Sequence, residues 1–186
     1  MAARALQIDP QSLEVRITAM RRRHLRSVLR IENEVYPRPW SLGLFMSELA
    51  IRTGRIYLVA RVGPTVVGYA GLLFSIDDGH VTTIAVDPAW HRSKIGSRLL
   101  LHLLRTATVK GAKNFTLEVR MSNEGAQALY RTFGFAPAGV RKGYYVETNE
   151  DAMIMWAHDV DQVEYQTRLD NIERSLPGIT ILDNLE

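Results

Sequence analysis

The stretch that decides the fold is IAVDPAWHRSKIGSRLLL, residues 84–101. It combines a short apolar strand, a turn with proline, a basic turn with one glycine, and the start of a helix. The backbone N–H groups of about residues 92–97 have no partner inside such a helix, and they are suited to bind phosphate. Arg92 and Lys94 add positive charge. Spacing alone leaves open a plain strand–turn–helix corner, because a single glycine is a weak phosphate-binding signal.

The composition is that of one globular domain, with 186 residues and an apolar fraction of 46%. The chain has no cysteine, which excludes disulfides, thiol nucleophiles and cysteine metal sites and agrees with a reducing cytoplasm. Its five histidines show no ligand spacing, so no metal is expected. No run of about 18 apolar residues is present, and a net charge of +3 does not indicate nucleic-acid binding. We expect a cytoplasmic protein that binds neither membrane nor nucleic acid directly.

A basic cluster, MRRRHLRSVLR at residues 20–30, has two interpretations. Its arginines could hold phosphates. However, Met20, His24, Val28 and Ile31 form an apolar stripe at helical spacing, with the arginines on the opposite face. We favour an amphipathic helix with a solvated basic face.

The remaining patterns predict an α/β domain with a mixed, mostly antiparallel sheet flanked by helices. The strand over 78–86, the helix over 95–109 and the next strand predict a parallel pair with a right-handed crossover. The expected elements are strands at 13–20, 56–62, 65–76, 78–86, 114–120, 138–146 and 151–160, and helices ending near 35 and at 42–50, 95–109 and 123–133.

These elements predict three segments of the chain. Residues 1–13 are expected to be a flexible leader and residues 14–157 the folded domain. Residues 158–186 are expected to be a C-terminal extension, a helix followed by a loose tail.

Two polar residues stand out on these elements. Glu118 is a carboxylate in the middle of a central strand, where such a group is rarely buried without a role or a partner. Pairing with Arg120 or Arg92, or an exposed position, is equally compatible with the pattern. Tyr130 lies on the apolar face of the next helix, so its hydroxyl needs a partner near the sheet. A tyrosine that only fills the core is the alternative.

Three segments together resemble the GCN5-related N-acetyltransferases. They are IAVDPAWHRSKIGSRLL, LEVRMSNEGAQALYRTFGF and YYVETNEDAMIMW, at residues 84–100, 117–135 and 144–156. The second segment is the most specific, and together with Pro39–Ser41 it is similar to bacterial ribosomal-protein-alanine N-acetyltransferases of the RimI type. The resemblance covers roughly residues 14–157 and implies an acyltransferase with a sheet that splays around acetyl-CoA.

The resemblance also implies which residues act. Glu118 would be the general base and Tyr130 the general acid, and no metal or covalent enzyme intermediate is needed. Acetyl-CoA would be held by main-chain groups of Ile84, Ala85 and Val86, by amides of Arg92, Ser93, Lys94, Ile95, Gly96 and Ser97 at its pyrophosphate, and by Asn123 at its arm.

The turn of this family usually reads Gln/Arg-x-x-Gly-x-Gly/Ala, and this chain departs from that pattern at two of the three marked positions, with His91 at the first and Lys94 at the glycine. If the turn requires a positive φ there, lysine is strained. If the position already belongs to the first helical turn, lysine fits and adds attraction.

The implied acceptor surface lies between the loop at 36–41 and the hairpin at 144–151. Four acids there, Glu34, Glu147, Glu150 and Asp151, could attract a basic N-terminus, or they could be ordinary exposed loop acids. The expected reaction is acetylation of the N-terminal α-amine of a protein partner, in particular a ribosomal protein that begins with alanine. The alternatives are a small-molecule amine or a lysine as acceptor, and a non-catalytic acyl-CoA-binding or interaction protein.

Overall fold

A computed structural model describes residues 9–185 of the chain. The helices are α1 (Leu25–Val35), α2 (Leu42–Ala50), α3 (Ile95–Val109), α4 (Glu124–Thr132) and α5 (Val163–Ser175). The strands are β1 (Glu14–Ala19), β2 (Arg55–Val62), β3 (Thr65–Ser75), β4 (Asp78–Val86), β5 (Asn114–Arg120), β6 (Ala136–Tyr145), β7 (Glu150–Ala157) and β8 (Ile179–Asp183).

The predicted leader falls mostly on residues 1–8, which lie outside the described residues. Pro10–Ser12 form a short 3-10 helix that the side chain of Asp9 caps, and Leu13 is buried. None of the helices in residues 9–185 has the length and apolar character that a membrane span requires.

The strands form one sheet in the order β6-β7-β5-β4-β3-β2-β1-β8. The pairs β4–β5 and β1–β8 are parallel, and the other pairs are antiparallel. The strands β4 and β5 pair only from Asp78 to His80, although β4 continues to Val86 and β5 to Arg120. The predicted mixed sheet is confirmed, and it opens between its two central strands.

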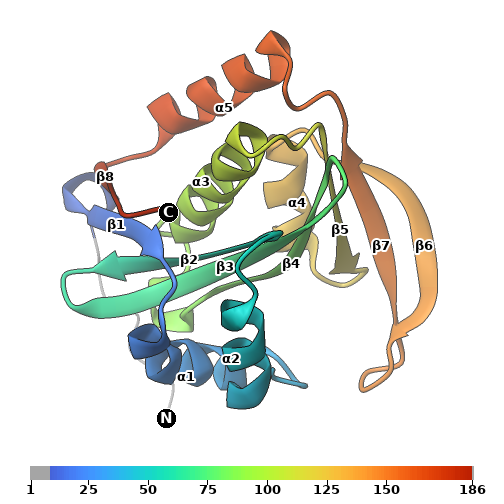
Figure 1. Cartoon of the computed structure of the whole chain (residues 1–186), viewed down its shortest axis with the longest axis horizontal. Helices are drawn as coiled ribbons and strands as arrows, with labels where there is room; N and C mark the ends of the chain where they lie inside the picture. Colours follow the sequence, from blue (N-terminus) through green and yellow to red (C-terminus); the bar gives the residue numbers. More distant parts are fainter. Residues whose placement is uncertain (1–8, 186) are drawn as a thin grey trace.

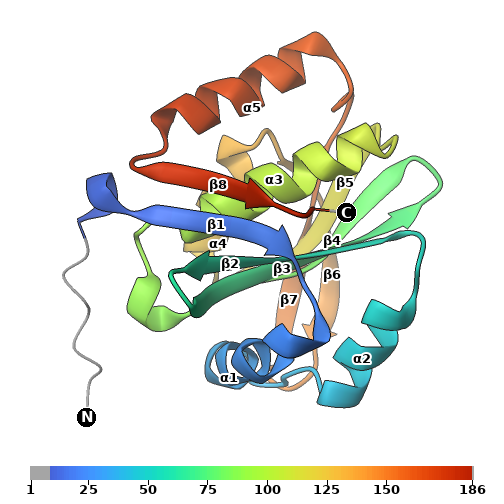
Figure 2. The same ribbon diagram turned by 60° about the vertical axis from the view of Figure 1, so that its left-hand side comes forward.

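Helices cover both faces of the sheet, with α1 and α2 on one face and α3, α4 and α5 on the other (Figures 1 and 2). Alternate side chains of β2 enter two different cores, because successive side chains of a strand point to opposite faces. Leu58 packs in the core that contains Leu99 of α3, and Val59 packs in the core that contains Val28 of α1. The arginines of the basic cluster lie on the exposed face of the α1 segment, as expected.

Local signals set the predicted ends of α2 and α3. The side chain of Ser41 accepts a hydrogen bond from the N–H of Leu44, which caps α2. Gly111 follows α3 with a φ of 106°, a conformation that only glycine adopts readily. Both helices therefore begin and end where the sequence predicted.

The C-terminal extension is more ordered than expected. The predicted helix of the extension forms as α5, with Leu169 and Ile172 buried. The following residues, expected to be a loose tail, form β8 beside β1. Arg98 of α3, only 1% exposed, donates hydrogen bonds to the carbonyl of Pro177 and the hydroxyl of Thr180. The extension thus adds an edge strand to the sheet.

Candidate active site

Two clefts meet where the sheet opens. The helix cleft, about 560 Å³ in volume, lies against the starts of α3 and α4. The hairpin cleft, about 480 Å³, lies between the α1–α2 loop and the β6–β7 hairpin. The residues that line both clefts are Tyr36, Ile84, Glu118, Arg120, Tyr130 and Tyr145. A reaction between two molecules that enter from the two sides would take place at these residues.

The free edge of β4 forms one wall of the helix cleft. Pairing with β5 ends at His80, so the later part of β4 has no strand neighbour on that side. Ile84, Ala85 and Val86 line the cleft there. The carbonyl of Ile84 accepts from the hydroxyl of Tyr36 at 2.7 Å, and that of Val86 lies 3.2 Å from Nε2 of His91. The N–H groups on such an edge can pair with an extended ligand as with another strand.

The turn before α3 differs from the simplest expectation. Arg92 and Lys94 both have left-handed backbone conformations, with φ values of 64° and 62°. Lys94 is the N-cap of α3, so the interpretation that it belongs to the first helical turn is wrong. A left-handed conformation costs an ordinary residue about 1–2 kcal/mol relative to glycine. The lysine therefore stands at a position that favours glycine.

The start of α3 nevertheless presents its N–H groups and two cations to the helix cleft. All the expected cofactor-binding residues except Ser93 line this cleft. The hydroxyl of Ser93 donates to the carbonyl of Trp90, and the residue is buried. Asn123 uses its side-chain oxygen to accept from the N–H of Ala126, which caps α4. The amide nitrogen of Asn123 and the second lone pair of its oxygen are then left to contact a ligand.

Glu118 is a nearly buried carboxylate at the junction of the two clefts, with its side chain 9% exposed. Its oxygens lie 3.1 Å from Nε2 of His80 and 3.3 Å from a guanidinium nitrogen of Arg141. The hydrogen bond from His80 is the main reason that the pKa of Glu118 lies below its usual value, and the charge of Arg141 adds to it. The carboxylate is therefore ionised at neutral pH. The alternative pairing with Arg92 or Arg120 is wrong.

Tyr130 points from α4 toward the same junction and is 5% exposed. Burial raises the pKa of its phenol far above the usual value. The hydroxyl therefore keeps its proton at neutral pH and can act as a donor.

Glu32 is a second buried carboxylate at the site, and the sequence analysis did not identify it. It lies on α1, lines the hairpin cleft and is 2% exposed. One oxygen accepts from the N–H of Trp40 at 2.8 Å, and the other has no partner among the described residues. Burial raises its pKa to about 7. Its place four residues after Val28, on the apolar stripe of the helix, was the available signal.

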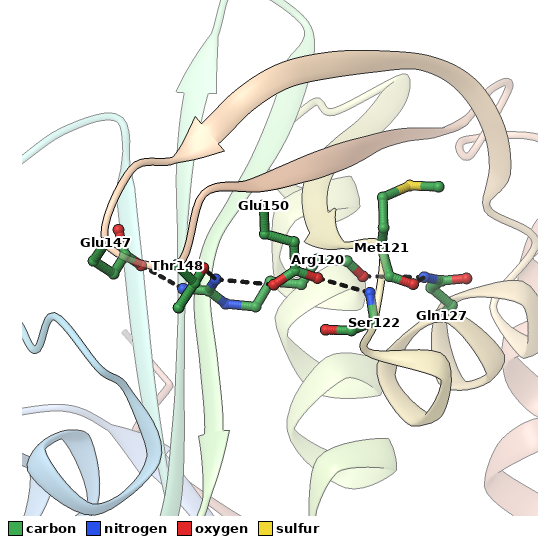
Figure 3. Close-up of polar contacts among 7 residues, drawn as sticks. All are labelled: Arg120, Met121, Ser122, Gln127, Glu147, Thr148 and Glu150. Carbon is green, nitrogen blue, oxygen red and sulfur yellow. Dashed lines mark hydrogen bonds and ion pairs between the residues drawn. The ribbon is translucent and has the colours of Figure 1, made fainter.

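The four acids expected at the acceptor surface are all engaged in ion pairs. Glu34 pairs with Arg30 and Asp151 with Lys142, and both Glu147 and Glu150 pair with Arg120 (Figure 3). Glu147 and Glu150 therefore serve first to fix the β6–β7 hairpin, which forms one wall of the hairpin cleft. Within the described part of the chain, no three acidic or histidine side chains lie together as metal ligands would.

Comparison with known proteins identifies a family. A model of the acetyltransferase (GNAT) family matches residues 25–135. The ribosomal protein bS18-alanine N-acetyltransferase of Escherichia coli is 33% identical over 141 residues, which cover 75% of this chain and 94% of that protein. The N-alpha-acetyltransferase RimI of Mycobacterium tuberculosis is 42% identical over 124 residues, 63% of this chain and 74% of that protein.

A solved structure has the same fold. The crystal structure of the ribosomal-protein-S18-alanine N-acetyltransferase from Escherichia coli matches with a TM-score of 0.71 and 30% sequence identity. The match covers 78% of this chain and 94% of that one.

Proposed function

The chain belongs to the acetyltransferase (GNAT) family and is an acyltransferase, and from this premise we propose its reaction. We propose that it transfers an acetyl group from acetyl-CoA to the N-terminal α-amine of a protein in the cytoplasm. A ribosomal protein with N-terminal alanine is the leading acceptor, in keeping with what the relatives are named for.

The observation that carries the proposal is the opening of the sheet with Glu118 and Tyr130 between the two clefts. The helix cleft has the features that acetyl-CoA requires. The free edge of β4 suits the extended pantetheine arm, and the start of α3 with Arg92 and Lys94 suits the pyrophosphate. The hairpin cleft is then left for the acceptor.

The residues at the junction provide the proton transfers. An α-amine with a pKa of about 7.7–8 is largely protonated at neutral pH and must lose a proton before it attacks the thioester. Glu118, held ionised by His80 and Arg141, accepts that proton directly or through water. As the C–N bond forms, the nitrogen loses its second proton to solvent water. As the C–S bond breaks, Tyr130 donates its proton to the departing sulfur, and solvent then restores the proton of Tyr130 and removes that of Glu118. A backbone N–H near Val86 stabilises the negative charge on the carbonyl oxygen.

An acceptor panel tests the proposal. We expect the protein with acetyl-CoA to add one acetyl group, seen by mass spectrometry, to a peptide that begins with alanine. We expect no addition to the same peptide with a blocked N-terminus and an internal lysine, nor to polyamines. Transfer to polyamines alone would make the chain a small-molecule acetyltransferase. If acetyl-CoA binds in calorimetry but nothing is acetylated, the enzymatic proposal fails.

A further inference from the structure

The backbone ladder of the β6–β7 hairpin is interrupted before its tip. The two strands pair regularly at Arg141 opposite Ala152, and then only at Tyr145 opposite Glu150, with an irregularity between. Gly143 in this interval has a φ of 58°. Such an irregular segment leaves the direction of nearby side chains to other contacts.

One arginine supplies those contacts. From the end of β5, the guanidinium of Arg120 donates to Thr148 at 2.6 Å, to Glu150 at 3.2 Å and to Glu147 (Figure 3). Its central carbon lies 3.8 Å from the centre of the Tyr145 ring, close enough for a cation–π contact. We call these five residues the Arg120 network.

The network is itself anchored to the floor of the site. The second oxygen of Glu150 accepts from the N–H of Ser122 at 2.8 Å. Gln127 of α4 donates to the carbonyls of Arg120 and Met121, at 3.0 Å each, and is buried (Figure 3). The backbone that carries Arg120 is thereby held against α4, the helix that also carries Tyr130.

The same network reaches the acceptor side of the cleft. Glu147 lines the hairpin cleft and Tyr145 lines both clefts, whereas Thr148 and Glu150 line neither cleft. The side chain of Arg120 is only 18% exposed, and those of its two carboxylate partners are 24% and 21% exposed. Ion pairs that are partly shielded from water and hydrogen-bonded through a planar guanidinium are geometrically specific. A lysine at this position would keep the positive charge but could not donate to several partners from one rigid, planar group.

We propose that Arg120 is a positioning residue for the acceptor: by fixing Tyr145 and Glu147 it sets the wall against which the acceptor's amine end is held. This inference rests on the proposed function. Arg120 and Tyr145 also line the helix cleft, but the guanidinium contacts described above go to the hairpin and not to the start of α3, so loss of these contacts should affect acceptor binding more than acetyl-CoA binding.

The test separates the two substrates. We expect Arg120→Gln to raise the KM for the alanine peptide about 10- to 100-fold, with the KM for acetyl-CoA changed less than about twofold, since small displacements of a positioning group cost rates of this order. Arg120→Lys should raise the acceptor KM by a smaller factor and not restore it fully. Lys142→Gln is the matched control, because it breaks an ion pair of the same hairpin outside both clefts and should leave both KM values unchanged.

An unchanged acceptor KM in both Arg120 variants, or an equal rise in both KM values, would overturn the inference. If Arg120→Gln does not fold, Glu150→Gln, which weakens one arm of the network, is expected to give the same one-sided rise. Amide hydrogen exchange over residues 140–151 gives a readout that needs no activity. We expect faster exchange there in Arg120→Gln than in Lys142→Gln, and equal exchange would contradict the network. If the wild type acetylates no acceptor, the proposed function fails while hydrogen exchange still tests Arg120.

Discussion

At the scale of single residues, the site depends on two acid–base groups in different states. Glu118 has a pKa below its usual value, mainly because His80 donates a hydrogen bond to it, whereas burial raises the pKa of Tyr130. One group is therefore ready to accept a proton and the other to donate one. These are the starting protonation states that the proposed base and acid require, while both shifts move the pKa values away from neutral pH.

Substitution of these two residues tests their roles. We expect Glu118→Gln and Tyr130→Phe each to lower kcat by roughly 10²–10⁴. Acetyl-CoA affinity in calorimetry should stay close to the wild-type value, because neither change alters the start of α3. Glu164→Gln, on the exposed surface of α5, serves as the control and should have wild-type kcat. Wild-type rates in both site variants would remove the assigned roles.

Glu32 predicts a pH dependence of stability. Its pKa is about 7 in the folded state against 4.5 for the ordinary group, so the folded state holds the proton more tightly than the unfolded state. The free energy of unfolding should then fall as the pH rises from about 4.5 to 7, by up to about 3 kcal/mol. Glu32→Gln, which keeps an acceptor for the N–H of Trp40, should remove this contribution to the slope.

Urea unfolding at several pH values measures that slope. Glu34→Gln on the same helix is the control, because Glu34 has an exposed ion pair with Arg30. We expect the control to keep the wild-type slope. Equal slopes in the wild type and Glu32→Gln would show that burial does not raise the pKa of Glu32 as described.

At the scale of elements, the start of α3 combines favourable chemistry with backbone strain. Its amides and cations suit an anion, but Lys94 has a φ of 62°. Lys94→Gly and Lys94→Ala both remove the charge, and only glycine adopts this φ without cost. We expect the glycine variant to be more stable than the alanine variant by about 0.5–1 kcal/mol in urea unfolding.

The same pair of substitutions at Lys110 provides the comparison. Lys110 caps the other end of α3 with a φ of −83°, where alanine fits. There we expect the alanine variant to be more stable than the glycine variant. Glycine loses more conformational entropy on folding, and at this φ it has no steric advantage that offsets the loss. If alanine were the more stable variant at position 94 as well as at position 110, the left-handed conformation of Lys94 would have no energetic consequence.

At the scale of the whole molecule, the C-terminal extension and the domain share one sheet. Parallel pairing of β8 with β1 is fixed from inside by Arg98, whose nearest partners are about 80 residues away in sequence. The extension accepts hydrogen bonds from both terminal nitrogens of a buried arginine that the domain core already contains, whereas its Nε has no partner among the described residues. The extension is therefore part of the folded unit rather than a loose attachment.

The sequence by itself determined the elements as far as α5, their order, and Glu118 and Tyr130 at the site. Caps such as Ser41, the stop at Gly111 and the apolar stripes act over a few residues, so they can be predicted from local spacing. Strand and helix spacing singled out Glu118 and Tyr130, and the family resemblance added their expected roles as base and acid. These are the parts of the fold and site that neighbouring residues encode together.

Only the tertiary structure decided which side chains meet. The partners of Glu118 come from β4 and β6, and the network of Arg120 joins β5 to the tip of the β6–β7 hairpin. The C-terminal residues form a strand because they pair with the edge of β1 and accept hydrogen bonds from Arg98. Even the φ of Lys94 follows from how the turn must pass from β4 to α3. Such contacts depend on the relative placement of elements far apart in the chain, and no local pattern of residues encodes that placement.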